Sequence, residues 1–151
     1  MRISDATAVC CPALEAVNKL DCIRQSVRLI FANDGLSYDA TEAIVNGILK
    51  REILGSSGIG RGVALPHTKH NCVVRIRSGV FVLRPPLEYD SLDGEPVNLI
   101  ICYISPSDRP GDHLRYGECV SRAFRNDDFV KSMIQCRCCE EMEKVLEEFN
   151  Y

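Results

Sequence analysis

Hydrophobic residues recur along the chain with two spacings that distinguish helices from strands. Within residues 20–31 the apolar side chains fall at steps of three and four, which places them on one face of a helix. Asn18 or Asp21 is positioned to cap the start of this helix, and Gly35 to close it. Residues 97–104 are instead an almost unbroken apolar run, which is typical of a central strand buried on both faces.

The remaining elements follow from the same patterns and from turn residues. A second helix is indicated where Asp39 and Glu42 resemble a capping box ahead of an apolar stripe at residues 44–49. A third begins at Asp112, in the position of an N-cap, and carries apolar side chains as far as Phe124. Two more helices are expected around residues 129–134 and 142–149, and shorter strands at 13–17, 63–65 and 73–83.

This succession of helices, strands and helices around one doubly buried strand predicts an α/β fold. We expect a three-layer sandwich, in which a mixed sheet of roughly five strands carries helices on both faces. At 151 residues the chain has the size of a single domain spanning 1–151, and no repeat or linker interrupts it. The sequence leaves the order of the strands open.

Composition and charge exclude several classes of protein. The apolar fraction of 46% and the charged fraction of 26% are ordinary for a globular domain. No apolar run approaches the roughly 20 residues of a membrane span, and the first residues lack the apolar segment of a signal peptide. We therefore expect a cytoplasmic protein without direct membrane insertion. The formal net charge of −3 and the scattered basic residues argue against nucleic acid as a partner.

Nine cysteines, an odd number spread through the chain, favour reduced thiols that pack as small apolar residues. A zinc site is the alternative. Its best candidates are His67, His70 and Cys72, with more distant partners at positions 136, 138 and 139. The paired C-x-x-C motifs that usually mark zinc sites are absent, so we expect no metal and no other cofactor.

The most informative stretch is REILGSSGIGRGVALPH, at residues 51–67. Four glycines, at positions 55, 58, 60 and 62, give a backbone that can adopt positive φ and bring N–H groups close to a bound anion. Arg51 opens the stretch as a charge partner for an anion, and Pro66 and His67 end it. The alternative interpretation is a tight glycine turn between a helix and a strand, followed by a surface histidine.

Three familiar motifs do not fit this stretch. A P-loop needs G-x-x-x-x-G-K-[ST], whereas Gly60 is followed by Arg61 and Gly62. A dinucleotide-binding fingerprint needs a preceding strand and a different glycine spacing. The hydrolase elbow G-x-S-x-G does not occur around Ser56 and Ser57.

His67 itself then becomes the candidate reactive group. A neutral imidazole can attack a phosphoryl group with its lone pair and form a labile N–P bond. Arg51 can contact the phosphoryl oxygens with two nitrogens at once. His113, at a predicted helix start, would be kept neutral by the helix dipole and would donate a hydrogen bond to the phosphate. Further phosphate-binding donors are expected in the loop at Ser56, Ser57 and Gly58.

Residues 51–67 closely resemble the phosphohistidine signature of the type-2 (fructose/mannitol and nitrogen-regulatory) enzyme IIA domains of the phosphoenolpyruvate-dependent sugar phosphotransferase system. That signature is typically R-E-x-x-G-S-T-G-I-G-x-G-[IV]-A-[IL]-P-H. The resemblance continues through DGEPVNLIICYISP and His113-Leu114, and covers most of the chain from about residue 20. It implies a fold with a mixed sheet between helices, which agrees with the layered fold predicted above.

The resemblance also implies a phosphotransferase component with named partners. His67 would accept a phosphoryl group on Nε2 from the phosphocarrier protein HPr. It would pass the group to a cysteine of a IIB domain, or its phosphorylation state would regulate a target protein. Arg51 and His113 match the family's active-site companions. Transport and regulation both remain open, with a slight preference for regulation, and the alternative is a metal-binding or purely protein-interaction module without phosphotransfer.

A few residues depart from the family pattern. Ser57 replaces the usual Thr and keeps the hydroxyl group. Gly117 falls where Leu is usual, and we expect it to cost ~1 kcal/mol in helix propensity and more in lost packing. Ile53 stands where a Glu is common, and Thr68 and Lys69 stand where a small residue and an Arg are usual. We expect none of these three replacements to affect the mechanism.

Overall fold

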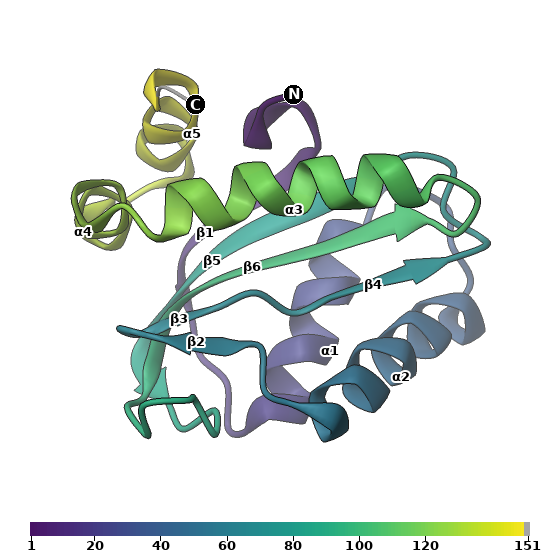
Figure 1. The fold of residues 1–151 in the computed structure, drawn as a ribbon, viewed down its shortest axis with the longest axis horizontal. Coiled ribbons are helices and arrows are strands. Elements are labelled where there is room, and N and C mark those ends of the chain that lie inside the picture. The colour runs from purple at the N-terminus through teal and green to yellow at the C-terminus, as the bar shows by residue number, and fades with distance from the viewer. Residues whose placement is uncertain (150–151) are drawn as a thin grey trace.

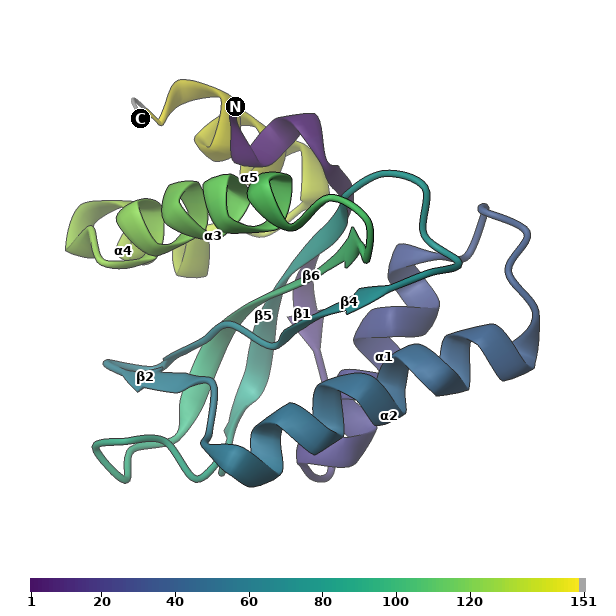
Figure 2. The same ribbon diagram turned by 45° about the vertical axis from the view of Figure 1, so that its right-hand side comes forward.

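The computed structural model describes residues 1–149 and folds them into three layers (Figure 1). The elements in chain order are η1 (Ile3–Asp5), β1 (Thr7–Leu14), α1 (Lys19–Ile30), α2 (Tyr38–Leu54), β2 (Gly58–Gly60), β3 (Val63–Ala64), β4 (His67–His70), β5 (Arg77–Leu87), β6 (Val97–Pro106), α3 (Pro110–Phe124), α4 (Asp127–Gln135) and α5 (Cys139–Glu148). Helices α1 and α2 cover one face of the sheet, and α3, α4 and α5 cover the other (Figure 2). The predicted α/β sandwich is confirmed. Within the described part of the chain, no helix is long and apolar enough to cross a membrane.

The sheet is mixed and has six strands, one more than the sequence predicts, in the order β1-β5-β6-β3-β2 with β4 also paired to β6. Strand β6 runs parallel to β3 and β4 and antiparallel to β5, and β1 pairs in parallel with β5. Every residue of β6 except Asn98 is buried, which confirms the prediction of a central strand covered on both faces. The two strands that lie outside the ranges expected from the sequence are the short segments β2 and β4.

Side chains of β6 alternate between the two hydrophobic cores, as the pleat of a strand requires. Leu99, Ile101 and Tyr103 belong to the core beneath α3, α4 and α5. Ile100, Cys102 and Ile104 belong to the core beneath α1 and α2. The alternation places the phenol ring of Tyr103 on the same face of the sheet as α3.

The first strand differs from its prediction. A strand was expected at residues 13–17, after Pro12, but β1 begins at Thr7 and runs through the proline. Strand β1 lies at the end of the sheet order, where a residue without an N–H group removes no ladder bond from a second neighbour. The pairing of β1 with β5 is irregular between Cys11 and Leu14, on either side of the proline.

Helix starts are partly as predicted. Asn18 caps α1, since its Oδ1 accepts a hydrogen bond from the Asp21 backbone N–H at 2.8 Å. The predicted cap of α2 at Asp39 is wrong, because Ser37 holds that position and accepts from the Ala40 N–H at 3.1 Å. Helix α1 ends at Ile30, before Gly35.

The start of α3 also lies earlier than the sequence suggests. The helix begins at Pro110, with Arg109 in the capping position, so the predicted N-cap at Asp112 is wrong. Proline suits the first turn because its missing N–H has no partner within the helix there. The early start places His113 inside the first turns of α3, which run beside the end of β6.

Candidate functional site

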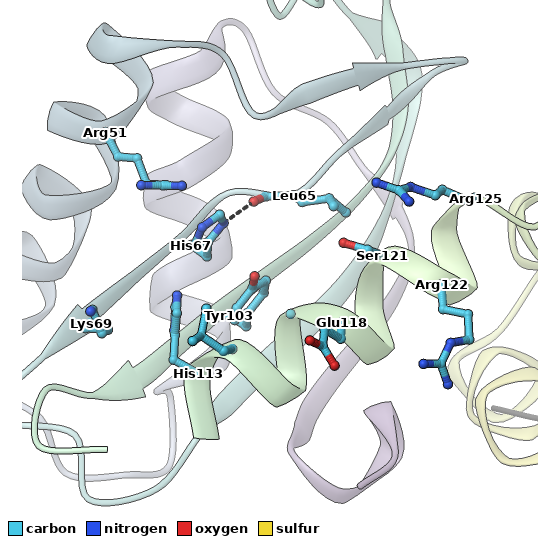
Figure 3. A pocket seen from close by; sticks show the side chains of 12 residues that line it. Arg51, Leu65, His67, Lys69, Tyr103, His113, Glu118, Ser121, Arg122 and Arg125 are labelled. Atoms are coloured by element: carbon cyan, nitrogen blue, oxygen red, sulfur yellow. Dashed lines mark hydrogen bonds between the residues drawn. The ribbon is translucent and has the colours of Figure 1, made fainter. Parts of the chain in front are cut away.

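Three layers of the fold contribute side chains to one cavity of about 840 Å³ (Figure 3). Arg51 extends from the end of α2 toward His67, the first residue of β4. Tyr103 comes from β6, and His113 from α3. Strands β4 and β6 pair in parallel with His67 opposite Tyr103, which brings these two residues together although they are distant in the sequence.

The ring of His67 is held by a hydrogen bond two residues back. Its Nδ1 lies 2.7 Å from the carbonyl oxygen of Leu65. A carbonyl oxygen only accepts, so Nδ1 carries the hydrogen, and in the neutral ring the lone pair is on Nε2. Burial lowers the pKa of His67, and Arg51 lowers it further, while the Leu65 carbonyl and the Glu52 carboxylate oppose the shift. The neutral imidazole is therefore the form present at pH 7.

The second histidine of the cavity is neutral as well. Nδ1 of His113 lies 2.7 Å from Oγ of Ser105, and its ring centroid is 5.4 Å from that of His67. Burial lowers the pKa of His113 to about 4, and the pKa is lowered further by His67 when that ring is protonated and by the cationic side chains of Lys69 and Arg51. The sequence predicted a neutral ring on the basis of the helix dipole, whereas the main cause here is burial.

No pattern in the sequence assigned Tyr103 to the site. Its phenol ring stacks on the imidazole of His67, with centroids 4.8 Å apart and planes 7° from parallel. Within the apolar run of residues 97–104 it looked like one more core residue. The two signals that would have indicated it are the alternation of β6 and the parallel register with β4, and the second needs the three-dimensional fold.

The glycine stretch is more ordered than the predicted loop. Residues 58–60 and 63–64 pair as the antiparallel strands β2 and β3, with a tight turn between them. That turn uses positive φ at Gly60, Arg61 and Gly62, with φ of 99°, 57° and 78°. The N–H of Arg61 donates to Oδ2 of Asp93 at 2.9 Å, so it is already paired.

The predicted phosphate donors are also paired within the protein. Oγ of Ser56 donates to the carbonyl of Tyr89 at 3.2 Å and accepts from the N–H of Gly58 at 3.1 Å. The N–H of Ser57 donates to Glu52 at 3.1 Å, and its hydroxyl donates to the same carboxylate. The two serines, together with Arg51 and His67, line a second cavity of about 360 Å³. Phosphate binding by these donors stays a prediction, and it requires them to change partners.

A buried carboxylate, which the sequence reasoning missed, fixes this loop to the helices. The side chain of Glu52 is 5% exposed and accepts from Nζ of Lys19 at 3.0 Å. It also accepts from the hydroxyl of Tyr89 at 3.2 Å, and Nζ of Lys19 lies 4.5 Å above the Tyr89 ring. Glu52 thus connects α1, the end of α2 and the serine loop. The immediate neighbour of Arg51 is held in place by these contacts.

The metal candidates do not converge. Nδ1 of His70 lies 2.8 Å from Sγ of Cys72 and accepts the Cys72 N–H at 3.2 Å. His70 lies three residues after His67 on β4, so the two side chains point to opposite faces of the strand. Among residues 1–149, no group of three or more His, Cys, Asp or Glu side chains could hold a metal ion.

All nine cysteines are free thiols. The expected absence of a C-x-x-C motif is wrong, because this spacing occurs once, at Cys136 and Cys139. Cys136 is buried and its thiol donates to the Ser132 carbonyl at 3.2 Å, whereas Cys139 is exposed. Burial raises the pKa of Cys136, which disfavours the thiolate that a metal would need.

Comparison with known proteins identifies the family. The family model described as "Phosphoenolpyruvate-dependent sugar phosphotransferase system, EIIA 2" matches residues 5–149. The chain belongs to this family. The predicted family is confirmed, and with it the role of a phosphotransferase-system component of the phosphocarrier or regulatory kind.

Relatives of this EIIA 2 chain include both kinds of component. It is 30% identical over 136 residues to a nitrogen regulatory protein of Bradyrhizobium diazoefficiens, covering 89% of this chain and 86% of that one. It is 24% identical over 120 residues to a fructose-specific EIIA component of Haloferax volcanii, covering 80% and 78%.

Two solved structures share the fold. The nitrogen regulatory protein IIA-Ntr of Neisseria meningitidis aligns with a TM-score of 0.85 at 26% identity, covering 95% of this chain and 98% of that one. The IIA mannitol domain of Escherichia coli, in a complex with phosphorylated IIB mannitol, aligns with a TM-score of 0.73 at 13% identity, covering 91% and 93%.

Proposed function

We propose that this EIIA 2 chain carries a phosphoryl group on Nε2 of His67. One observation supports this assignment above all. The Leu65 carbonyl engages Nδ1 of His67, which leaves Nε2 as the nitrogen with a free lone pair beside an open cavity. A lowered pKa keeps that lone pair unprotonated at neutral pH.

The transfer step balances without any further reactant. The Nε2 lone pair of His67 attacks the phosphorus atom of a phosphohistidine on the donor, which we propose is HPr. The donor's N–P bond breaks, and its electron pair returns to the donor imidazole. The proton on Nδ1 of His67 stays in its hydrogen bond to Leu65, so the phosphorylated ring carries a positive charge. A cysteine thiolate of a IIB domain would take the phosphoryl group in a second, similar displacement.

Arg51 and His113 would stabilise the phosphoryl oxygens. The planar guanidinium of Arg51 can contact two oxygens at once. The hydroxyl of Ser105 can donate to Nδ1 of His113, and Nε2 of the neutral His113 ring then carries a hydrogen to donate to an oxygen. Both groups line the same cavity as His67. They act on charge that develops at phosphorus during transfer.

Of the two roles, we favour regulation, in which phosphorylation of His67 changes the affinity for a target protein. The relatives that support this preference are nitrogen regulatory proteins, at 30% identity in sequence and with a TM-score of 0.85 in structure. Transport remains the second candidate, because a fructose-specific EIIA component is also a relative.

A reconstitution experiment tests the proposal. The chain is incubated with phosphoenolpyruvate, enzyme I and HPr, and its intact mass is measured under neutral to alkaline conditions. We expect one acid-labile phosphoryl group, which His67→Ala abolishes and the matched control His70→Ala retains. A label that survives in His67→Ala would contradict the assignment. Stoichiometric zinc that blocks phosphorylation would instead support the metal-binding alternative.

A further inference from the structure

The phenol of Tyr103 forms the back wall of the imidazole site. It is 4% exposed, and it lies parallel to the His67 ring at 4.8 Å, which is a stacking distance. The contact follows from the backbone, because His67 and Tyr103 are paired residues of adjacent parallel strands. It is also visible in the close view of the cavity (Figure 3).

A second aromatic ring holds Tyr103 from behind. Tyr116 of α3 meets it edge to face, with centroids 5.3 Å apart and planes at 75°. The hydroxyl of Tyr116 is itself fixed, at 2.6 Å from Oγ of Ser78 and 3.1 Å from the Ile3 carbonyl. The position of the Tyr103 ring is therefore defined on the side away from His67.

Gly117 provides the space for the phenol. A Cβ atom at this position would lie 3.1 Å from the hydroxyl oxygen of Tyr103, which is closer than side-chain carbons normally approach. Lost packing was expected at Gly117, but the volume above it is occupied by the tyrosine. Gly117 lowers the helix propensity of α3, but the absence of a side chain there leaves space for an aromatic ring beside the reactive histidine.

An aromatic partner stabilises the His67 imidazole when that ring becomes positively charged. The charged or titratable groups nearest to His67 are Arg51 and Glu52 from α2, Lys69 from β4, and His113 from α3. The other charged side chains that line the cavity are Glu118, Arg122 and Arg125. Most of these are positive or become positive, and burial adds to the cost of a cationic ring. The face of an aromatic ring attracts a cation placed above it.

We propose that Tyr103 is a positioning residue for phosphoryl transfer. This inference rests on the proposed phosphorylation of His67. The ring of Tyr103 holds the His67 imidazole in the plane set by the Leu65 hydrogen bond. The π face of Tyr103 also stabilises the positive charge that His67 gains as the N–P bond forms. Gly117 is part of the same arrangement because it admits the phenol.

Variants of the 151-residue chain separate the effect of the Tyr103 ring from that of its hydroxyl. Tyr103→Phe keeps the aromatic face, and we expect transfer from phospho-HPr within about twofold of the wild-type rate. Tyr103→Leu removes the face, and we expect a roughly tenfold slower rate, the size of one cation–π contact. NMR should show a lower pKa for His67 in Tyr103→Leu, together with loss of the ring-current shift on its imidazole protons, whereas Tyr103→Phe keeps both.

A double variant distinguishes positioning from simple packing. Tyr103→Leu combined with Gly117→Leu refills the space left by the phenol without restoring an aromatic face. We expect it to regain the thermal stability lost in Tyr103→Leu while transfer stays slow and the His67 pKa stays low.

Recovery of the transfer rate in the double variant would overturn the inference, as would equal rates and equal His67 pKa values in Tyr103→Phe and Tyr103→Leu. If Tyr103→Leu does not fold, the double variant and Tyr103→Phe still give the comparison. A wild-type chain that takes up no phosphoryl group would overturn the proposed function itself, and that result is separate from any difference among the variants.

Discussion

A single hydrogen bond decides which nitrogen of each histidine is available. Nδ1 of His67 faces a carbonyl oxygen, which can only accept, so its hydrogen is fixed there. Nδ1 of His113 faces a hydroxyl, which can donate, so that ring is free to hold its hydrogen on Nε2. The two rings, 5.4 Å apart, therefore offer a lone pair and a donor side by side while both are neutral.

The neutral state of His113 has a consequence for stability at acid pH. Its pKa is about 4 in the folded chain and 6.5 as the ordinary value, so the unfolded state binds the proton first as pH falls. Stability from this group is present above pH 6.5 and is lost between pH 6.5 and about 4. Because the half-buried ring is partly screened by solvent, we expect an effect of roughly 1–2 kcal/mol.

Urea unfolding of wild type and His113→Gln at pH 7 and near pH 4.5 measures this contribution. Wild type should lose more free energy of unfolding than the variant between the two conditions. The variant keeps the pH dependence of the free energy of unfolding that other groups cause, including that of His67, whose pKa is also lowered. An equal loss in both proteins would show that His113 does not stay neutral in the fold.

At the scale of elements, the sequence predicts best where one pattern acts alone. The unbroken apolar run predicts β6 and the three- and four-residue spacing predicts α1, and both elements are found. Strand β1 starts earlier than predicted, because the expected strand began only after Pro12, whereas the position of β1 at the end of the sheet lets the strand run through the proline. The glycines of residues 58–62 indicate a turn, but pairing of β2 with β3 depends on the rest of the sheet.

The residues of the site also fall into two groups, those that the sequence indicates and those that only the fold reveals. The family resemblance names His67, Arg51 and His113, and the fold brings all three to one cavity. Tyr103 and Glu52 act through contacts between elements, which no local spacing reveals. The role of Tyr103 becomes visible only once β4 lies beside β6, and that of Glu52 only once the end of α2 lies beside α1 and Tyr89.

The contact between α3 and β6 allows a direct test of the space at Gly117. Gly117→Ala should gain helix propensity but crowd the Tyr103 hydroxyl, so we expect little net change in the wild-type background. In Tyr103→Phe the hydroxyl is gone, and the same change should stabilise the chain by about 0.5–1 kcal/mol. Thermal or urea unfolding of the four proteins gives the coupling. Identical effects of Gly117→Ala in both backgrounds would show that the phenol and the glycine do not share space.

Charge is distributed unevenly over the whole molecule. The formal net charge is −3, yet the main cavity is lined by Arg51, Lys69, Arg122 and Arg125 with one carboxylate, that of Glu118. A donor that presents a phosphoryl group carries negative charge where the two proteins meet. Long-range attraction between such groups raises the association rate and is screened by salt over about 8 Å at physiological ionic strength.

The rate of transfer from the phosphorylated donor should therefore fall as salt rises from about 0.05 to about 0.5 M. Arg122→Gln removes a lining charge that lies apart from the stacked rings, and we expect a roughly two- to fivefold slower second-order rate at low salt with a shallower salt dependence. Lys144→Gln is the matched control, because this exposed lysine of α5 lies outside the cavity lining. Rapid-quench measurements of all three proteins over the salt series decide the matter. If both variants lose the same fraction of the rate, the effect belongs to net charge and not to the charged lining of the site.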